Sequence, residues 1–351
     1  MHNKNDIITM KTINLFLTFD YELPLGGWIV TPEEALIEPT NKILQICENL
    51  NLSVTFFVDV LSFIKLREIE NNNFEKSIRQ QLSEIVAKGH DIQLHLHPHW
   101  LTSYLDNETY NPSKDYKLSD FNESEISDMV IKGIEYLNEI AKPINPDYQC
   151  LAFRAGGYNL ENSPVIFKIL EKNGIIIDSS ICHGYCFASD VSTIDYRDVP
   201  NVSNWFFENG DYNKASKSGI YEIPIAGKKK SFYEVPTFVK TKIYRNRTPI
   251  NRGKMIYSAN KSPVLEIFKR AVSSRMLSFD NYTYSLRFLM KILKYNLKKF
   301  EKQQEINLSI IAHPKSMDRY NFKLMVDFIV SVRKLYGEKI VFNTFRKFWN
   351  V

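Results

Sequence analysis

The order of secondary-structure signals along the chain is the feature that most constrains its fold. Short runs of β-branched and aromatic residues alternate with amphipathic stretches of helical period. This alternation predicts parallel strands joined by helices, which close into a barrel or form a doubly wound sheet. We expect strands at residues 12–19, 53–58, 90–96, 150–153, 175–178, 307–312 and 339–342, and helices at 39–50, 74–88, 123–141, 163–172 and 320–336.

Composition and charge exclude several classes of protein for this chain. The chain has 351 residues, of which 44% are hydrophobic and 24% charged, as in an ordinary globular protein. A net charge of +5 is too small to indicate nucleic-acid binding. No apolar run is long enough for a transmembrane helix, and the first residues lack the apolar core of a signal peptide. The four cysteines are sparse, which favours free thiols and a cytoplasmic protein.

A cluster of histidines follows the strand expected at residues 90–96. His95, His97 and His99 are three of the seven histidines in the chain, and they lie within five residues. Neutral imidazole is the commonest protein ligand of a catalytic divalent metal, so the cluster indicates a metal site. The alternative interpretation is a group of histidines on a surface loop.

Other polar residues stand at the carboxyl ends of the expected strands. In a parallel βα barrel all these ends open on one face, which is where barrel active sites are built. We therefore expect the strand-end side chains to share one pocket. They are Asp20 and Glu22, the histidines from His95 to His99, Arg154, Asp178 and His313.

Two later stretches depart from the simple alternation. Residues 193–260 contain β-like segments at 219–225 and 231–239, and we interpret them as an insertion beside the barrel mouth. Residues 285–304 form a basic amphipathic helix. Such a helix either packs its apolar stripe on the outside of a barrel or lies weakly on an anionic membrane surface.

Six short motifs resemble those of a known family. The chain resembles the polysaccharide deacetylases, the metal-dependent esterases and amidases that share the NodB homology domain, also called carbohydrate esterase family four. The resemblance implies one domain over residues 1–351, folded as a distorted (β/α)7 barrel of the α/β class with a β-containing insertion. Without a secretion signal, the chain looks like the branch found in surface-polysaccharide and lipopolysaccharide biosynthesis clusters. The motifs are Thr18-Phe19-Asp20, Val54 to Val58, Gly89-His90-Asp91-Ile92 leading to His95 and His99, Phe153 to Tyr158, Asp178-Ser179-Ser180 and Ile311 to Pro314.

The resemblance implies one divalent metal bound by two histidines and a carboxylate. His95 and His99 have the family's four-residue spacing, whereas Tyr21 stands where the family usually has a second aspartate. We prefer Glu22 as the third ligand and Asp20 as the general base, with the reverse assignment open. On an extended backbone these two acids point the same way. Zinc suits these donors, and cobalt, nickel or iron fit similar ones. His97 matches no family ligand and is a fourth donor, a substrate contact or a hydrogen-bonded loop residue.

The remaining roles also follow from the resemblance. Asp20 takes the proton of the attacking water and His313 protonates the departing amine. Arg154 holds Asp20 ionised and oriented, and Asp178 does the same for His313. A backbone N–H near Gly157 stabilises the oxyanion. Residues expected to contact the sugar are Trp100, Tyr158 and His97.

These features together predict a metal-dependent hydrolase that removes an acyl group, above all N-acetyl, from an amino sugar. The substrate is a glycan or a nucleotide-linked or lipid-linked precursor of surface polysaccharide. Two alternatives remain open. One is an allantoinase-like amidohydrolase that acts on a small non-carbohydrate C–N substrate. The other is a non-catalytic glycan-binding or assembly protein, because the altered Asp20-Tyr21-Glu22 sequence is consistent with lost activity.

Overall fold

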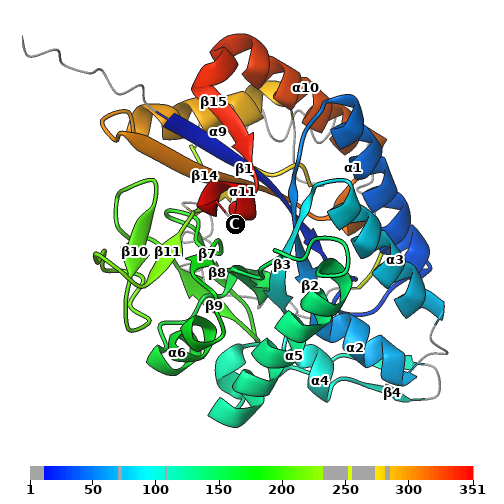
Figure 1. Ribbon diagram of the computed structural model, residues 1–351. Helices are drawn as coiled ribbons and strands as arrows, with labels where there is room; N and C mark the ends of the chain where they lie inside the picture. Colours follow the sequence, from blue (N-terminus) through cyan, green and yellow to red (C-terminus); the bar gives the residue numbers. More distant parts are fainter. Residues whose placement is uncertain are drawn as a thin grey trace, which may run out of the picture.

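A curved sheet of mostly parallel strands forms the centre of the molecule (Figure 1). The computed structural model describes residues 12–69, 73–106, 109–231, 252–254, 273–280 and 285–350. The strands run in the order β10-β11-β7-β6-β3-β2-β1-β14, and β15 also pairs with β1. The strands of this sheet are β1 (Thr12–Tyr21), β2 (Thr55–Asp59), β3 (Asp91–Leu96), β6 (Ala152–Ala155), β7 (Ile177–Asp178), β10 (Trp205–Phe207), β11 (Ile220–Glu222), β14 (Glu305–Ala312) and β15 (Ile340–Asn343).

The first strand, β1, lies at the centre of a network of paired strands. Nine of the ten residues of β1 are buried, as expected of a parallel strand that is covered on both faces. One edge of β1 pairs with β14 from Thr12 to Phe19, and the other edge pairs with β15 and then with β2. Every pairing from β7 to β14 along the sheet is parallel, so the carboxyl ends of these strands lie at the same end.

Hydrogen bonds beyond β11 close the sheet on itself. The backbone at residues 224–226 bonds to β14 at Ser309, because Ser309 N donates to the Pro224 carbonyl at 2.8 Å and Ala226 N donates to the Ser309 carbonyl at 2.8 Å. Farther along β14, Ile311 N donates to the Leu277 carbonyl at 3.1 Å. These bonds leave β14 without an open edge over this region. The expected distorted α/β barrel is thereby confirmed.

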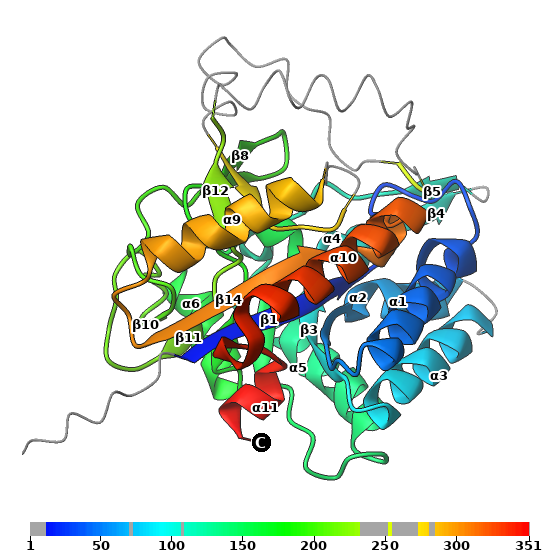
Figure 2. The same cartoon turned by 90° about the horizontal axis from the view of Figure 1, so that it is seen from above.

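Helices cover the outside of the barrel (Figures 1 and 2). The helix α5 buries one side, which includes Ile126, Val130 and Leu137, and it begins at a capping box in which Asn122 and Glu125 exchange side-chain and backbone hydrogen bonds. All four cysteines are buried free thiols. Among the described residues, no helix combines the length and the apolar character that crossing a bilayer needs. The helices are α1 (Glu38–Asn49), α2 (Val60–Ile69), α3 (Asn73–Ala87), α4 (His99–Thr102), α5 (Glu123–Ala141), α6 (Pro164–Lys172), α9 (Leu286–Lys299), α10 (Arg319–Tyr336) and α11 (Phe345–Trp349).

The predicted insertion is described only in part. Residues 193–231 and 252–254 of the span 193–260 fall within the described residues, whereas almost all of the β segment expected at 231–239 falls outside them. The short strands that lie outside the barrel sheet are β4 (Tyr104–Asp106), β5 (Thr109–Asn111), β8 (Cys186–Ala188), β9 (Thr193–Asp195), β12 (Gly227–Lys229) and β13 (Ser274–Met276).

The basic helix expected at 285–304 is present as α9 and is shorter than expected. Its apolar stripe, which includes Leu289, Ile292 and Leu293, is buried against the barrel. The structure therefore supports the interpretation of an outer barrel helix, and the apolar residues of α9 are not available for insertion into a membrane.

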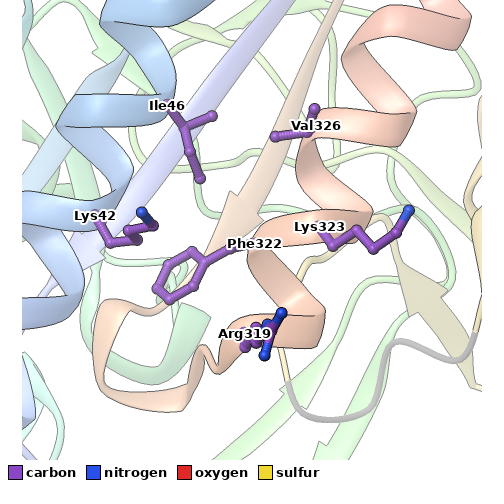
Figure 3. A pocket seen from close by; sticks show the side chains of 6 residues that line it. All are labelled: Lys42, Ile46, Arg319, Phe322, Lys323 and Val326. Atoms are coloured by element: carbon purple, nitrogen blue, oxygen red, sulfur yellow. The ribbon is translucent and has the colours of Figure 1, made fainter.

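A surface pocket of about 410 Å³ lies between α1 and α10 (Figure 3). Its floor is apolar and its rim carries three cationic side chains. None of its lining residues is one of the strand-end residues, so this pocket is not the candidate site. The lining residues are Lys42, Ile46, Arg319, Phe322, Lys323 and Val326.

Candidate metal centre

A carboxylate and two imidazoles meet at the carboxyl end of the barrel. Glu22 follows β1, His95 lies in β3 and His97 follows it directly. Glu22 Oε2 is 2.6 Å from His97 Nε2 and 3.3 Å from His95 Nε2, and one donor atom from each residue lies within 4.8 Å of the others. All three side chains are buried. His95 and His97 point the same way because side chains alternate along an extended strand.

The hydrogen bonds around these three residues suit a divalent metal. His95 Nδ1 is 2.8 Å from the Arg154 carbonyl, which can only accept, so Nδ1 carries a hydrogen and, in the neutral ring, Nε2 has the lone pair and faces Glu22. His97 Nδ1 is buried and has no hydrogen-bond partner among the described residues. Two imidazole nitrogens and one carboxylate are a ligand set that zinc and similar ions accept, with coordination positions left open. The residues present therefore fit the expected metal.

His99, expected as a ligand, is not part of this group. Pro98 lies at the start of α4, so the chain leaves the direction of β3 directly after His97. The His99 ring stacks on Tyr116 with a centroid distance of 5.8 Å, and it lies 5.0 Å from Trp100. Burial and the neighbouring His97 hold the pKa of His99 well below its usual value. The structure places His97, rather than His99, beside Glu22 and His95.

Lys315 is a further partner of Glu22 that the sequence analysis missed. Its ammonium nitrogen lies 3.0 Å from Glu22 Oε1 and donates to the Leu23 carbonyl at 2.9 Å. Burial alone would raise the pKa of Glu22, but the charges of Lys315 and His97 outweigh it and hold that pKa well below its usual value. Lys315 stands two residues after His313, and this position is the sequence signal that could have identified it.

Asp20 is held by Arg154, as the sequence predicts. Arg154 Nη1 donates to Asp20 Oδ1 at 2.6 Å and to Thr18 Oγ1 at 2.9 Å, and its Nε donates to the Ser179 carbonyl at 2.8 Å. Both charged side chains are buried. Burial raises the pKa of Asp20. The charges of Arg154, His95 and His313, of which Arg154 has the largest effect, outweigh burial, so the pKa lies below its usual value. Asp20 is therefore an oriented carboxylate.

His313 is paired with Asp280, and not with Asp178 as expected. His313 Nδ1 is 2.8 Å from Asp280 Oδ2, and the His313 backbone N–H donates to Asp280 Oδ1 at 2.7 Å. His313 Nε2 faces the site, at 3.5 Å from Asp20 Oδ2 and 3.0 Å from the Tyr158 hydroxyl. Burial lowers the pKa of His313, but Asp280 more than compensates and raises it to about 9.

Asp178 belongs to a separate acid pair inside the barrel. Its carboxylate accepts hydrogen bonds from the backbone N–H and the hydroxyl of Ser180. It pairs in register with Glu222 of β11, and burial together with the mutual repulsion of these acids raises the pKa of Glu222 well above its usual value. The expectation for Asp178 was wrong because Asp280, at the end of residues 273–280, takes the place beside His313 Nδ1.

The turn after β6 passes close to the histidines. Gly157 has φ +58°, in the left-handed region that favours glycine. A Cβ atom on Gly156 would lie 2.8 Å from His97 Nδ1, and one on Gly157 would lie 2.5 Å from the Tyr116 hydroxyl. This close approach is consistent with the predicted oxyanion donor near Gly157, which stays a prediction.

The aromatic residues expected to contact a sugar have different surroundings. Tyr158 is partly buried and its hydroxyl reaches His313, so it lies at the site. Trp100 is only 1% exposed, and its Nε1 donates to Asp59 Oδ2 at 2.8 Å. The buried indole packs in the core. Trp100 is therefore a structural residue, and the expectation that it contacts substrate is corrected.

Comparisons with known proteins add evidence on the fold. No protein-family profile and no curated protein sequence matches this chain. A 4-alpha-glucanotransferase from Thermococcus litoralis is 13% identical, with a TM-score of 0.52 over 97% of this chain and 40% of that chain. A protein from Mycobacterium smegmatis named as a polysaccharide deacetylase is 14% identical, with a TM-score of 0.49 over 97% and 90% of the two chains. Puue allantoinase is 12% identical, with a TM-score of 0.49 over 96% and 89%.

Other similar solved structures include a peptidoglycan N-acetylglucosamine deacetylase and a family 4 acetyl xylan esterase from Clostridium thermocellum. At 13% identity the similarity to the 4-alpha-glucanotransferase concerns the fold alone, and the chemistry of this chain is argued from its site.

Proposed function

We propose that this chain is a metal-dependent hydrolase that removes an acyl group from an amino sugar, with N-acetyl as the group and a glycan or its nucleotide-linked or lipid-linked precursor as the substrate. The observation that carries the proposal is the buried group of Glu22, His95 and His97. It lies beside the Asp20–Arg154 and His313–Asp280 pairs at one end of the barrel.

Asp20 and His313 supply the proton transfers of the proposed reaction. Glu22, His95 and His97 would hold the metal, whose Lewis acidity would activate water and an amide carbonyl near neutral pH. Asp20 takes a proton from the water as its oxygen attacks the carbonyl carbon. His313, protonated at neutral pH because its pKa is raised to about 9, gives a proton to the nitrogen as the C–N bond breaks. The products are a carboxylic acid and the free amino sugar.

Metal content and acyl release test the proposal together. Protein loaded with zinc is incubated with a panel of nucleotide-activated N-acetyl sugars, and free acetate is measured by mass spectrometry. We expect one bound metal per chain and acetate release from at least one sugar. His97→Ala should lose both, whereas the matched control His183→Gln, at a histidine that bonds the Pro200 carbonyl, should keep both.

Two outcomes would contradict the proposal. Turnover by metal-free protein would remove the role of Glu22, His95 and His97. A metal-loaded protein that binds glycans and releases no acyl group from any of them would instead favour the non-catalytic alternative. The variant His99→Ala tests whether His97 or His99 is the second histidine ligand. We expect this variant to retain the metal, whereas the spacing of the family motif predicts its loss.

A further inference from the structure

Charge is strongly segregated along the chain. Residues 227–302 contain 19 of the 45 Lys and Arg residues and only four of the 40 Asp and Glu residues. This stretch therefore has a net charge of +15, and the rest of the chain has a net charge of −10. A modest net charge of +5 for the whole chain conceals one strongly basic segment.

The described part of this segment presents its cations on one face of α9. Arg287, Lys291, Lys294 and Lys298 are all exposed. Their spacings of four, three and four residues place them on a single stripe of the helix, about 16 Å long at 1.5 Å per residue. The helix contains no acidic residue. Its apolar side chains lie on the opposite side, buried against the barrel.

The neighbouring strand β12 extends the stripe. Asn296 of α9 donates to the Gly227 carbonyl at 3.0 Å, which fixes β12 beside the helix (Figure 2). Lys229 is exposed, and the Lys228 ammonium lies 5.9 Å from the centre of the Tyr295 ring. Tyr295 is 41% exposed, so an amphipathic ring lies among the cations. We call this surface the basic face; it consists of Lys228, Lys229, Arg287, Lys291, Lys294, Tyr295 and Lys298.

We propose that the basic face binds the surface of an anionic phospholipid bilayer. The cations form a straight stripe on a convex helix, on long flexible stems that can reach many headgroups of a flat charged surface at once. Tyrosine is enriched at the headgroup level of membranes. Because the apolar stripe of α9 is buried in the barrel, binding is electrostatic adsorption without insertion and weakens with salt. The inference is independent of the proposed reaction.

Vesicle sedimentation tests the inference on the full chain. We expect the protein to sediment with vesicles of phosphatidylcholine and phosphatidylglycerol, but not with phosphatidylcholine alone, and to be released at about 1 M salt, where the screening length is about 3 Å. The fourfold variant R287Q/K291Q/K294Q/K298Q should lose at least about 100-fold in partition coefficient. Glutamine is a good helix former, so α9 should persist, and circular dichroism checks this.

A matched control removes four cations from the other side of the molecule. The variant K132Q/K142Q/K168Q/K172Q changes exposed lysines of α5, α6 and their ends, and lowers the net charge equally. It should sediment like the parent. If the fourfold α9 variant fails to fold, the pair K291Q/K294Q serves, with an expected loss of about tenfold or more.

Three results would overturn the inference. The first is no sedimentation with anionic vesicles. The second is an equal loss in the control variant, which would show dependence on net charge alone. The third is binding of a labelled DNA duplex by the parent, and not by the α9 variant, in the absence of vesicle binding, which would assign the basic face to nucleic acid.

Discussion

Replacing Arg154 tests whether the ion pair beneath the candidate metal centre organises this end of the barrel. Arg154 is fully buried, and every polar nitrogen of its guanidinium has a partner: Asp20, Thr18 and the backbone carbonyl and hydroxyl of Ser179. Its planar group also lies 4.1 Å from the centre of the Phe57 ring. Arg154→Met keeps the length of the side chain and removes all of these hydrogen bonds.

The expected cost follows from these contacts. Removing one partner of a buried ion pair costs about 3–5 kcal/mol, and leaving the Ser179 carbonyl without its donor adds about 1–3 kcal/mol. We expect Arg154→Met to lower the free energy of unfolding by about 4–8 kcal/mol, a large part of the roughly 5–15 kcal/mol typical of a whole domain. Asp20→Asn should cost about 3 kcal/mol, because its amide oxygen still accepts a hydrogen bond.

Urea unfolding followed by circular dichroism measures both variants and their combination. The double variant should cost about 2 kcal/mol less than the sum of the single variants, since neither charge is then left alone. Arg79→Met is the control: Arg79 bonds Glu75 and Glu139 at the partly exposed surface, where an ion pair contributes at most about 1 kcal/mol. Additive costs, or equal costs for Arg154→Met and Arg79→Met, would refute the reasoning.

Three further predictions concern other buried groups. Burial and the nearby lysines lower the pKa of His90 to about 4, below the 6.5 of the unfolded chain. Its contribution to the free energy of unfolding is therefore full above pH 6.5 and falls by about 3 kcal/mol as the pH drops to 4. Urea midpoints measured across this pH range should show the decline in the parent protein and not in His90→Asn. Gly157→Ala should lower the melting temperature and acyl release together, because its φ of +58° and the Tyr116 hydroxyl both disfavour a Cβ atom; an unchanged melting temperature would contradict this. Trp100→Phe should cost about 1–3 kcal/mol by leaving Asp59 Oδ2 without a donor, with KM unchanged; a raised KM would restore Trp100 as a substrate contact.

The convergence of strand-end residues could be predicted from the sequence because it depends on local patterns alone. Runs such as residues 12–19 and 307–312 mark strands, and helices between them require parallel pairing. Once the pairing is parallel, Asp20, Arg154 and His313 must lie at one end of the barrel. Their contacts in the structure confirm this.

Two features of the site depend on information that local patterns lack. The partner of His313 is Asp280, and the sequence between them says nothing about which acid will reach the imidazole. The choice between His97 and His99 depends on where β3 ends. Alternation along the strand already places His95 and His97 on one side, and Pro98 marks the turn, so this signal was present and was outweighed by the family spacing.

The two acids at the carboxyl end of β1 have different surroundings. Asp20 and Glu22 point the same way, yet each has a different cation: Arg154 Nη1 contacts Oδ1 of Asp20, and the Lys315 ammonium contacts Oε1 of Glu22. Oε2 of Glu22 is left to the two imidazoles. A guanidinium that is fixed by four hydrogen bonds orients a proton acceptor, and a carboxylate with one oxygen turned to two imidazole nitrogens lies where the three groups can share one ion. The partners of these acids therefore favour Glu22 on the metal and Asp20 as the base.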